Sequence, residues 1–464
     1  MSNYLAVDLG AESGRVMLAA VNSGRLILEE LHRFPNEPVQ VPSGLYWDSF
    51  RLFHEIARGL TIAARERKLS VDGIGVDTWG VDFGLLDADG ALVDCPRHYR
   101  DARTIGIPER LFEVVPREEV FASTGIQIMA LNSLYQWYAM HIANVAALKV
   151  THRLLFMPDL LNYWLTGVQR AEVTIASTSQ FFNSASRGFA TGLLEKLALP
   201  ARILAELIEP GRKLGTLRPV VGEMTGLGAA PVYATASHDT ASAVAAVPAE
   251  GDDWCYISSG TWSLMGVELS APVINEASRT LNFTNEAGFG GSVRFLKNLA
   301  GLWPLQECRR AWTAKSEKLS YEELTRLAEE AGPAQSLINL DDFAQPGDMP
   351  ERIAAASGSR TKGEICRVIL ESLARQYREV LEGLESLTGK SIRTIHIVGG
   401  GSRNGMLNQL TANATGRRVV AGPVEATAAG NALVQAVGAG EVADGRAIRE
   451  IVRRSFALEV FEPR

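Results

Sequence analysis

Two segments of the sequence share a strand, turn, strand pattern with a glycine and hydroxyl side chains in the turn. They are residues 4–21 and 254–269, and in each of them apolar, β-prone runs flank the turn. Such a pattern predicts a β-hairpin. Because Gly10 and Gly260 lie about half the chain apart, we expect two halves of like architecture, whose turns grip one polyphosphate from both sides. The length of 464 residues agrees, since it exceeds what one hydrophobic core fills.

The first hairpin carries groups that suit a bound phosphate. Its turn contains Gly10, Ser13 and Gly14, where bare backbone and N–H groups can approach phosphate oxygens. Arg15 adds a planar cationic fork. Asp8, at the end of the first strand, is placed to hold Mg²⁺ through water. A plain surface hairpin is the alternative, because short glycine-rich turns are common.

A carboxylate stands where a strand passes into a helix near the middle of the chain. Residues 230–235 predict a short buried strand, and an Ala/Ser-rich segment of helical character follows. Asp239 lies at this junction, beside His238 and Thr240, and such loops border the ligand crevice of an open α/β sheet. There it can accept a proton from a substrate hydroxyl. The alternative is that Asp239 only caps the helix.

A loop between two strands predicted within residues 71–86 offers groups for a sugar ring. Trp79 presents an apolar face, and Gly80 allows a close approach of the backbone. The alternative is a tryptophan in the core with Asp77 and Asp82 in solvent.

Between residues 98 and 210 the sequence indicates structure more than catalysis. Asp101 is expected to form an ion pair with Arg103 or Arg100. Residues 110–210 are mostly helical in pattern, residues 154–165 included, and carry no compact catalytic signature. We expect them to cover the substrate side of the first domain.

Three glycines, at 399–401, end a predicted buried strand and leave room for a flat ring or a phosphate against the backbone. A helix capped by Ser402 or Asn404 is expected next. The stretch is neither a GxGxxG dinucleotide fingerprint nor a P-loop. Small residues at 425–432 predict close helix packing.

Composition excludes several classes of partner. The net charge of −7 without a basic run speaks against nucleic acid or an anionic membrane. The four cysteines include no C-x-x-C pair, which favours reduced thiols over a zinc site or a disulfide framework. We find no signal-peptide pattern and no apolar span of membrane length, and therefore predict a cytoplasmic protein.

Taken in order, five motifs resemble those of the FGGY family of carbohydrate kinases, and the resemblance spans nearly the whole chain. The motifs are Asp8-Leu9-Gly10 with Gly14-Arg15, Asp77-Thr78-Trp79-Gly80, Ser237-His238-Asp239-Thr240, Ser259-Gly260-Thr261-Trp262-Ser263 and Gly399-Gly400-Gly401-Ser402-Arg403-Asn404. This resemblance implies two ribonuclease-H-like, actin-like α/β domains with a catalytic cleft between them. We place the N-terminal, sugar-binding domain at 1–243 and the C-terminal, nucleotide-binding domain at 244–464.

The resemblance also implies a reaction. It is closest to the branch of the family that transfers the γ-phosphoryl group of MgATP to the 1-hydroxyl of L-rhamnulose. Kinases for other ketoses, such as L-fuculose or L-xylulose, and a non-catalytic sugar or nucleotide sensor are the alternatives. The expected partners are a small ketose and a nucleotide, with no nucleic acid or membrane, and the protein is expected to be a monomer or a homodimer.

Carried over residue by residue, the resemblance assigns roles within the site. Asp239 matches the catalytic base, and Asp8 matches the anchor of Mg²⁺ through water. Four positions match sugar contacts: Gly80, His238, Thr240 and, as a weaker match, Trp79. Nine match nucleotide contacts: Ala11, Glu12, Ser13, Gly14, Arg15, Thr261, Asn298, Gln306 and Gly400. Glu12 departs from what a phosphate turn favours, because its carboxylate repels a nucleotide unless it points away or toward the metal.

Overall fold

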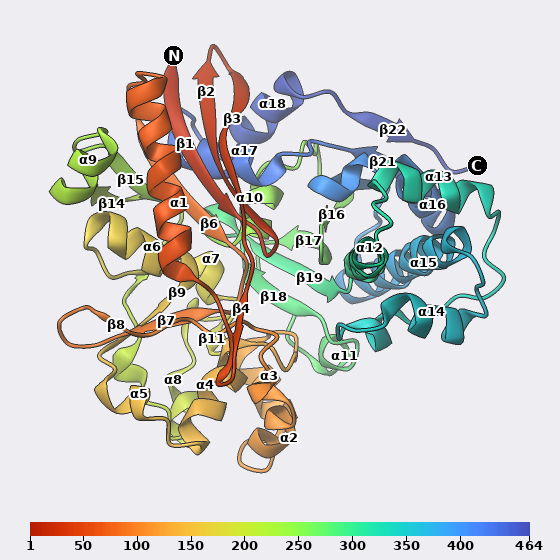
Figure 1. Cartoon of the computed structure of the whole chain (residues 1–464), viewed down its shortest axis with the longest axis horizontal. Helices are drawn as coiled ribbons and strands as arrows, with labels where there is room; N and C mark the ends of the chain where they lie inside the picture. Colours follow the sequence, from red (N-terminus) through yellow and green to blue (C-terminus); the bar gives the residue numbers. More distant parts are fainter. The chain divides into compact units, whose positions relative to one another are not determined.

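The structure, a computed structural model, describes all residues from 1 to 464. Its chain contacts divide it into two compact units (Figure 1). The first unit comprises Met1–Ala246, Glu268–Phe295 and Ala426–Ser455, and the second comprises Val247–Val267, Leu296–Glu425 and Phe456–Arg464. The first unit thus includes two segments from later in the chain, 268–295 and 426–455. The division into two domains at residue 243 stays a prediction.

The main sheet of the first unit is mixed, with six strands in the order β14-β15-β6-β1-β2-β3. Its strands are β1 (Ser2–Leu9), β2 (Ser13–Asn22), β3 (Arg25–Pro35), β6 (Gly73–Thr78), β14 (Arg212–Thr216) and β15 (Pro231–Ala234). The hairpin β1–β2 is antiparallel, as the glycine-bearing turn predicts, and β6 lies parallel to both β1 and β15. Parallel neighbours bring the ends of β1, β6 and β15 to one edge of the sheet.

Helices cover this sheet. Helix α1 (Ser49–Thr61) packs on β2, where a Cβ at Gly59 would collide with Val16. Helix α17 (Ala426–Gly438) packs on β1 and β6 and runs beside α10 (Asp239–Ala245). At Gly430 an added Cβ would overlap the carbonyl oxygen of Ser242, so the close helix packing expected at 425–432 is confirmed.

Residues 83–205 of the same unit build a second core around the small sheet β8-β7-β9. Its strands are β7 (Phe83–Leu86), β8 (Leu92–Asp94) and β9 (Arg153–Phe156), and its larger helices are α2 (Ile107–Phe112), α3 (Arg117–Thr124), α4 (Ser133–Ile142) and α6 (Met157–Thr166). The helical prediction for 154–165 is wrong at its start, because Leu154 to Phe156 pair with β7. A short apolar run fits a strand and a buried helix equally well.

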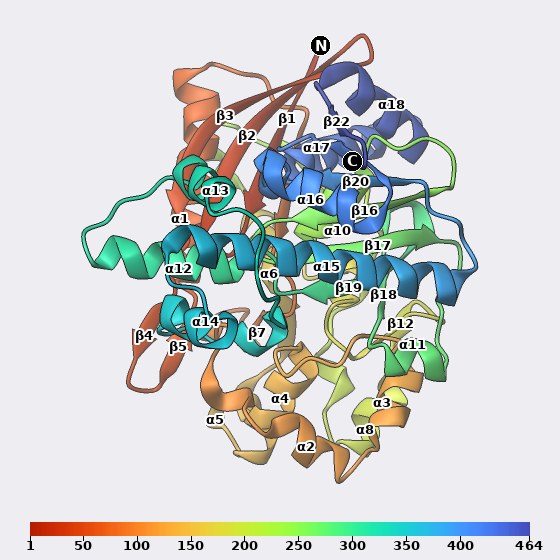
Figure 2. The same cartoon turned by 90° about the vertical axis from the view of Figure 1, so that its right-hand side faces the viewer.

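The second unit holds strands in the order β17-β16-β20-β21-β22. They are β16 (Trp254–Ser259), β17 (Ser263–Leu269), β20 (Thr394–Val398), β21 (Arg418–Ala421) and β22 (Glu459–Phe461). The hairpin β16–β17 is antiparallel, and β20 lies parallel to β16 and β21. Helix α15 (Lys362–Thr388), the long blue helix of Figure 2, starts with a capping box between Thr361 and Glu364.

Candidate active site

Three carboxylates gather at the strand ends of the first unit. Asp8 near the end of β1 lies opposite Asp77 of β6 in the parallel register. The next strand, β15, leads into α10, and a β-bridge joins Thr78 to His238. Asp239 follows as the first residue of α10. The fold therefore brings together carboxylates that lie far apart in the sequence.

Asp239 has the environment of a proton acceptor. Its side chain is 30% exposed. Its Oδ1 accepts hydrogen bonds from the backbone N–H of Thr240 at 2.5 Å and from the Thr240 hydroxyl at 3.2 Å. Burial raises the pKa of Asp239, an effect that the neighbouring His238 reduces. The residue at the N-cap position is His238, so Asp239 is not the helix cap.

Asp8 and Asp77 each have one strong partner. The guanidinium of Arg15 donates to Asp8 Oδ2 through Nε at 3.0 Å and Nη2 at 2.7 Å. Asn431 of α17 donates to Asp77 Oδ2 at 2.5 Å. Asp77 is fully buried, and this burial, with the charge of Asp8, raises its pKa well above the usual range.

These carboxylates also fit a water-bound magnesium ion. The Oδ1 atom of Asp77 is buried and has no hydrogen-bond partner, and the negative charges of Asp8 and Asp239 both act on Asp77. A cation would offset this repulsion. No three His, Cys, Asp or Glu side chains form a cluster that could hold a metal ion directly.

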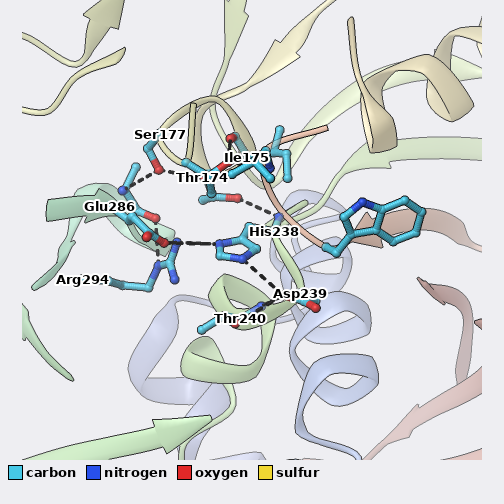
Figure 3. A network of polar contacts seen from close by, with 12 residues as sticks. Thr174, Ile175, Ser177, His238, Asp239, Thr240, Glu286 and Arg294 are labelled. Carbon is cyan, nitrogen blue, oxygen red and sulfur yellow. Dashed lines mark hydrogen bonds and ion pairs between the residues drawn. The ribbon is translucent and has the colours of Figure 1, made fainter. Parts of the chain in front are cut away.

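His238 is held from two sides (Figure 3). Its backbone N–H donates to Thr174 Oγ1 at 3.2 Å. The Nε2 atom of its ring lies 3.3 Å from Asp239 Oδ1, and its Nδ1 atom lies 3.4 Å from Glu286 Oε2. Arg294 reaches the same Nδ1 atom with Nη2 at 3.1 Å. The imidazole therefore connects the candidate base to a buried ion pair.

Trp79 is packed into the first unit. It is 5% exposed, lies 4.0 Å from Trp47 between ring centroids, and donates from its indole N–H to Asp82 at 2.9 Å. Asp77 and Asp82 are buried, so the alternative of a core tryptophan holds for Trp79 but its solvated carboxylates do not. Gly80 is half-buried, and an added Cβ would lie 3.2 Å from the Thr178 side chain. The absence of a side chain at Gly80 is thus explained by its packing against Thr178.

Asp101 forms the expected ion pair with Arg103 and a second ion pair with Arg97, which the sequence did not predict. Its Oδ1 lies 3.7 Å from Arg97 and 4.0 Å from Arg103. Arg100 instead places its guanidinium 5.4 Å from the ring centroid of Tyr99. Asp101 also accepts the N–H groups of Leu45 and Arg103, as a structural residue does.

The first turn is braced from within the first unit. The N–H of Gly10 donates to Ser13 O at 3.0 Å, and Asn36 donates to Gly10 O from its side chain at 2.8 Å. Ala11 and Ser13 are half-buried and Glu12 is exposed. A Cβ at Gly14 would lie 2.6 Å from Leu9 and overlap Phe34. Gly14 is thus required by protein packing, whereas Ala11, Glu12 and Ser13 present the backbone of the turn.

The second turn has a similar brace inside the second unit. The N–H of Gly260 donates to Trp262 O at 2.9 Å, and the Trp303 N–H donates to Thr261 O at 3.1 Å. Thr261 is half-buried. The side chains at this turn are neutral, unlike the Asp8 and Arg15 pair of the first hairpin.

The three glycines that follow β20 divide into two kinds. A Cβ at Gly399 would lie 2.9 Å from Ser259 O, and one at Gly401 would overlap Ser259 Oγ. Gly400 is exposed, and a Cβ added there would have no atom within 4 Å. The helix that follows, α16 (Gly405–Thr415), is capped by Asn404, which confirms one of the two expected caps.

Asn298 and Gln306 lie in the second unit with Thr261 and Gly400. Asn298 is half-buried in β19 (Val293–Leu299), and Gln306 lies in α12 (Trp303–Ala314). The Gln306 Oε1 atom is buried and has no hydrogen-bond partner. An unpaired buried acceptor is costly, so this atom is available for a donor outside the chain.

Sequence reasoning missed several residues that hold the site. They are Glu172, Thr174, Glu286, Arg294 and Asn431. Glu172 is buried, accepts the Ser237 N–H at 3.1 Å, and has its pKa raised to about 7 by burial. A charge within an apolar β-prone run is a signal for such a position, and Arg294 between Val293 and Phe295 shows it, whereas Glu286 does not.

The four cysteines are free, and three of them are buried. None of the helices combines the length and the apolar character that a membrane crossing requires.

The profile described as the FGGY family of carbohydrate kinases, N-terminal domain, matches residues 3–246. Its C-terminal counterpart matches residues 255–439. A protein named rhamnulokinase from Bacteroides thetaiotaomicron is 47% identical over 99% of this chain and 96% of its own length. Rhamnulokinase from Bacillus subtilis is 39% identical over 99% of this chain and 95% of its own length.

Solved structures agree on the fold. A ligand-bound xylulose kinase from Lactobacillus acidophilus matches with a TM-score of 0.83 at 15% identity, covering 100% of this chain and 94% of its own. Plasmodium falciparum glycerol kinase with ADP matches with a TM-score of 0.80 at 15% identity, with the same coverage of 100% and 94%. The two-domain α/β fold is confirmed, and the chain belongs to the FGGY family of carbohydrate kinases.

Proposed function

We propose that this protein transfers the γ-phosphoryl group of MgATP to the 1-hydroxyl of L-rhamnulose, giving L-rhamnulose 1-phosphate and ADP, as a step in L-rhamnose catabolism. The observation that carries this substrate is the identity of 47% and 39% to proteins named rhamnulokinase over almost their full lengths. The half-exposed carboxylate of Asp239, with its raised pKa, supplies the group that the reaction needs.

Asp239 is the proposed general base. As the sugar oxygen forms its bond to the γ-phosphorus and the bond to the β,γ-bridging oxygen breaks, the hydroxyl proton passes to the carboxylate. Phosphoryl transfer depends mainly on in-line positioning and charge stabilisation. Gly80, His238 and Thr240 are proposed to orient the sugar. Magnesium bound through water at Asp8 would neutralise the charge of the phosphates.

The nucleotide contacts are proposed for both units. In the first unit they are Ala11, Glu12, Ser13, Gly14 and Arg15, with Gly14 shaping the turn. In the second unit they are Thr261, Asn298, Gln306 and Gly400. The unpaired Oε1 atom of Gln306 and the open position at Gly400 support these assignments.

A cytoplasmic location and a monomeric or homodimeric state remain predictions.

An ADP-release assay with MgATP and a panel of ketoses and their aldoses tests the proposal. We expect a clear preference for L-rhamnulose over L-fuculose and L-xylulose. Turnover with a different ketose would change the proposed substrate and leave the proposed kinase activity in place. Absence of sugar-stimulated ADP release with every ketose would contradict the proposal and favour a sensor.

A further inference from the structure

We infer that Arg294 and Glu286 are positioning residues: they hold His238 with its proton on Nε2, which fixes one oxygen of the Asp239 carboxylate. Both residues come from a hairpin outside the recognised motifs, formed by β18 (Thr284–Ala287) and β19. The inference rests on the proposed role of Asp239 as the base.

The tautomer follows from the chemistry of the contacting atoms. A guanidinium group has donors only, so Arg294 Nη2, at 3.1 Å from Nδ1 of His238, requires Nδ1 to be the acceptor. In the neutral imidazole the proton then lies on Nε2. That N–H faces Asp239 Oδ1, which is 3.3 Å away (Figure 3).

Glu286 holds Arg294 in place. Its Oε2 lies 3.0 Å from Arg294 Nη2, and both side chains are at most 5% exposed. The guanidinium also donates from Nε to Ala287 O at 3.0 Å, which fixes its plane. A charge as deeply buried as that of Arg294 is costly without its partner. The pair is therefore a rigid support behind the imidazole.

The consequence for Asp239 is an unequal use of its two oxygens. Oδ1 faces three donors: the Thr240 N–H, the Thr240 hydroxyl and the Nε2 proton of His238. This leaves Oδ2 for the sugar hydroxyl. If the proton moved to Nδ1, it would point at Glu286, and the Nε2 lone pair would face Oδ1 and repel it. The base would then lose its fixed orientation.

Two-bond ¹H–¹⁵N spectra of the ¹⁵N-histidine-labelled protein, recorded without sugar, measure the tautomer directly. The chain has seven histidines, and His238→Gln identifies the resonance. In the wild type we expect a neutral ring with the proton on Nε2. A proton on Nδ1, or on both nitrogens at pH 8, would overturn the inference without any dependence on a variant's folding.

Arg294→Met should move the proton to Nδ1, with Glu286 as acceptor, and lower kcat about hundredfold, since a misplaced reacting group has an effect of this size. The KM for ATP should stay unchanged. Glu286→Gln keeps Arg294 and should retain the Nε2 tautomer with a smaller loss. Arg294→Met with wild-type kcat and tautomer would refute the inference.

Arg449→Met provides the matched control. Arg449 pairs with Glu268 in the same unit, half-buried and outside the proposed site. We expect it to leave the His238 resonance and kcat unchanged. An equal loss of kcat in both variants, with no change of tautomer, would assign Arg294 a general structural role and contradict the inference. Failure of the wild type to phosphorylate any ketose would instead contradict the proposed function, because the tautomer is measured without sugar.

Discussion

The two glycine-bearing hairpins share one backbone plan and differ in charge. In both, an antiparallel hairpin places its first strand parallel to a later strand, β6 in one unit and β20 in the other. In the first hairpin Asp8 lies opposite Arg15, whereas in the second Ser259 lies opposite Ser263. The same local fold therefore serves a charged site in one unit and a neutral one in the other.

The contrast extends to the acids of the two units. In the first unit, burial raises the pKa of five acids: Asp77, Asp82, Asp159, Glu172 and Asp239. Hydrogen bonds and ion pairs lower the pKa of other acids in both units, such as Glu29 and Glu30 in the first and Glu322, Glu351 and Glu364 in the second, where no carboxylic acid with a raised pKa is found. Raised pKa values concentrate where proton transfer is proposed, as is common in active sites.

The largest expected effect comes from neutralising the base of the charged unit. Asp239→Asn should lower kcat by about 10²–10⁴-fold, the usual contribution of a general base. The dissociation constant for ATP, measured by calorimetry, should remain similar. Asp253→Asn, at an exposed acid before β16 of the second unit, is the control and should retain full turnover. A near-normal kcat in Asp239→Asn would contradict the role of Asp239 as the base, and with it the link between raised pKa values and proton transfer in the first unit.

A second test addresses the packing of the neutral hairpin. Gly401→Ala would force a methyl group onto Ser259 Oγ and should lower the free energy of unfolding by about 1–3 kcal/mol. Gly400→Ala meets no atom within 4 Å and should leave stability unchanged. Denaturant titration measures both variants. Equal stability of the two variants would contradict the close contact between residue 401 and Ser259.

The pH dependence of stability should separate the units. Burial raises the pKa of Asp82 to about 6 and that of Glu172 to about 7, so the native state holds these protons to higher pH than the unfolded chain does. Stability is therefore lost as the pH rises from about 4 through these values, by about 2–3 kcal/mol between pH 5.5 and 7.

Hydrogen exchange at these two pH values, corrected for intrinsic rates, tests this sign. We expect protection in β1 and β6 to decrease at pH 7, while β16 and β20 change less. Protection of β1 and β6 that increases with pH would contradict the raised pKa values.

The smallest expected effect is that of a reducing agent. All four cysteines are free, one in the first unit and three in the second, so dithiothreitol should leave the melting temperature unchanged. Differential scanning calorimetry measures this. A clear decrease would indicate a disulfide, and its location would show which unit depends on it.

Local patterns predicted the elements that bear the main motifs. The strand and helix around Asp239 and the two hairpins follow from short-range periodicity and from turn residues, and the structure confirms them. The helix prediction at Leu154 is wrong, because only the partner strand β7 decides the state of that apolar run.

Contacts between distant segments could not be predicted in the same way. Asn431 reaches Asp77, and Arg294 reaches His238, across long stretches of chain. No spacing rule connects such residues, since their proximity depends on the whole sheet. For Trp79 the sequence left a core and a ligand position open, and its burial against Trp47 now favours the core.

Helix α17 has a consequence for how the chain is made. It covers β1 and β6, and its Gln435 donates to the carbonyl oxygen of Leu5, near the start of the chain. A ribosome delivers this helix only after almost the whole chain has been synthesised. Until then β1 and β6 of the nascent first unit lack the cover of this helix, although N-terminal domains generally fold first during synthesis. Its last folding step must follow the synthesis of most of the second unit.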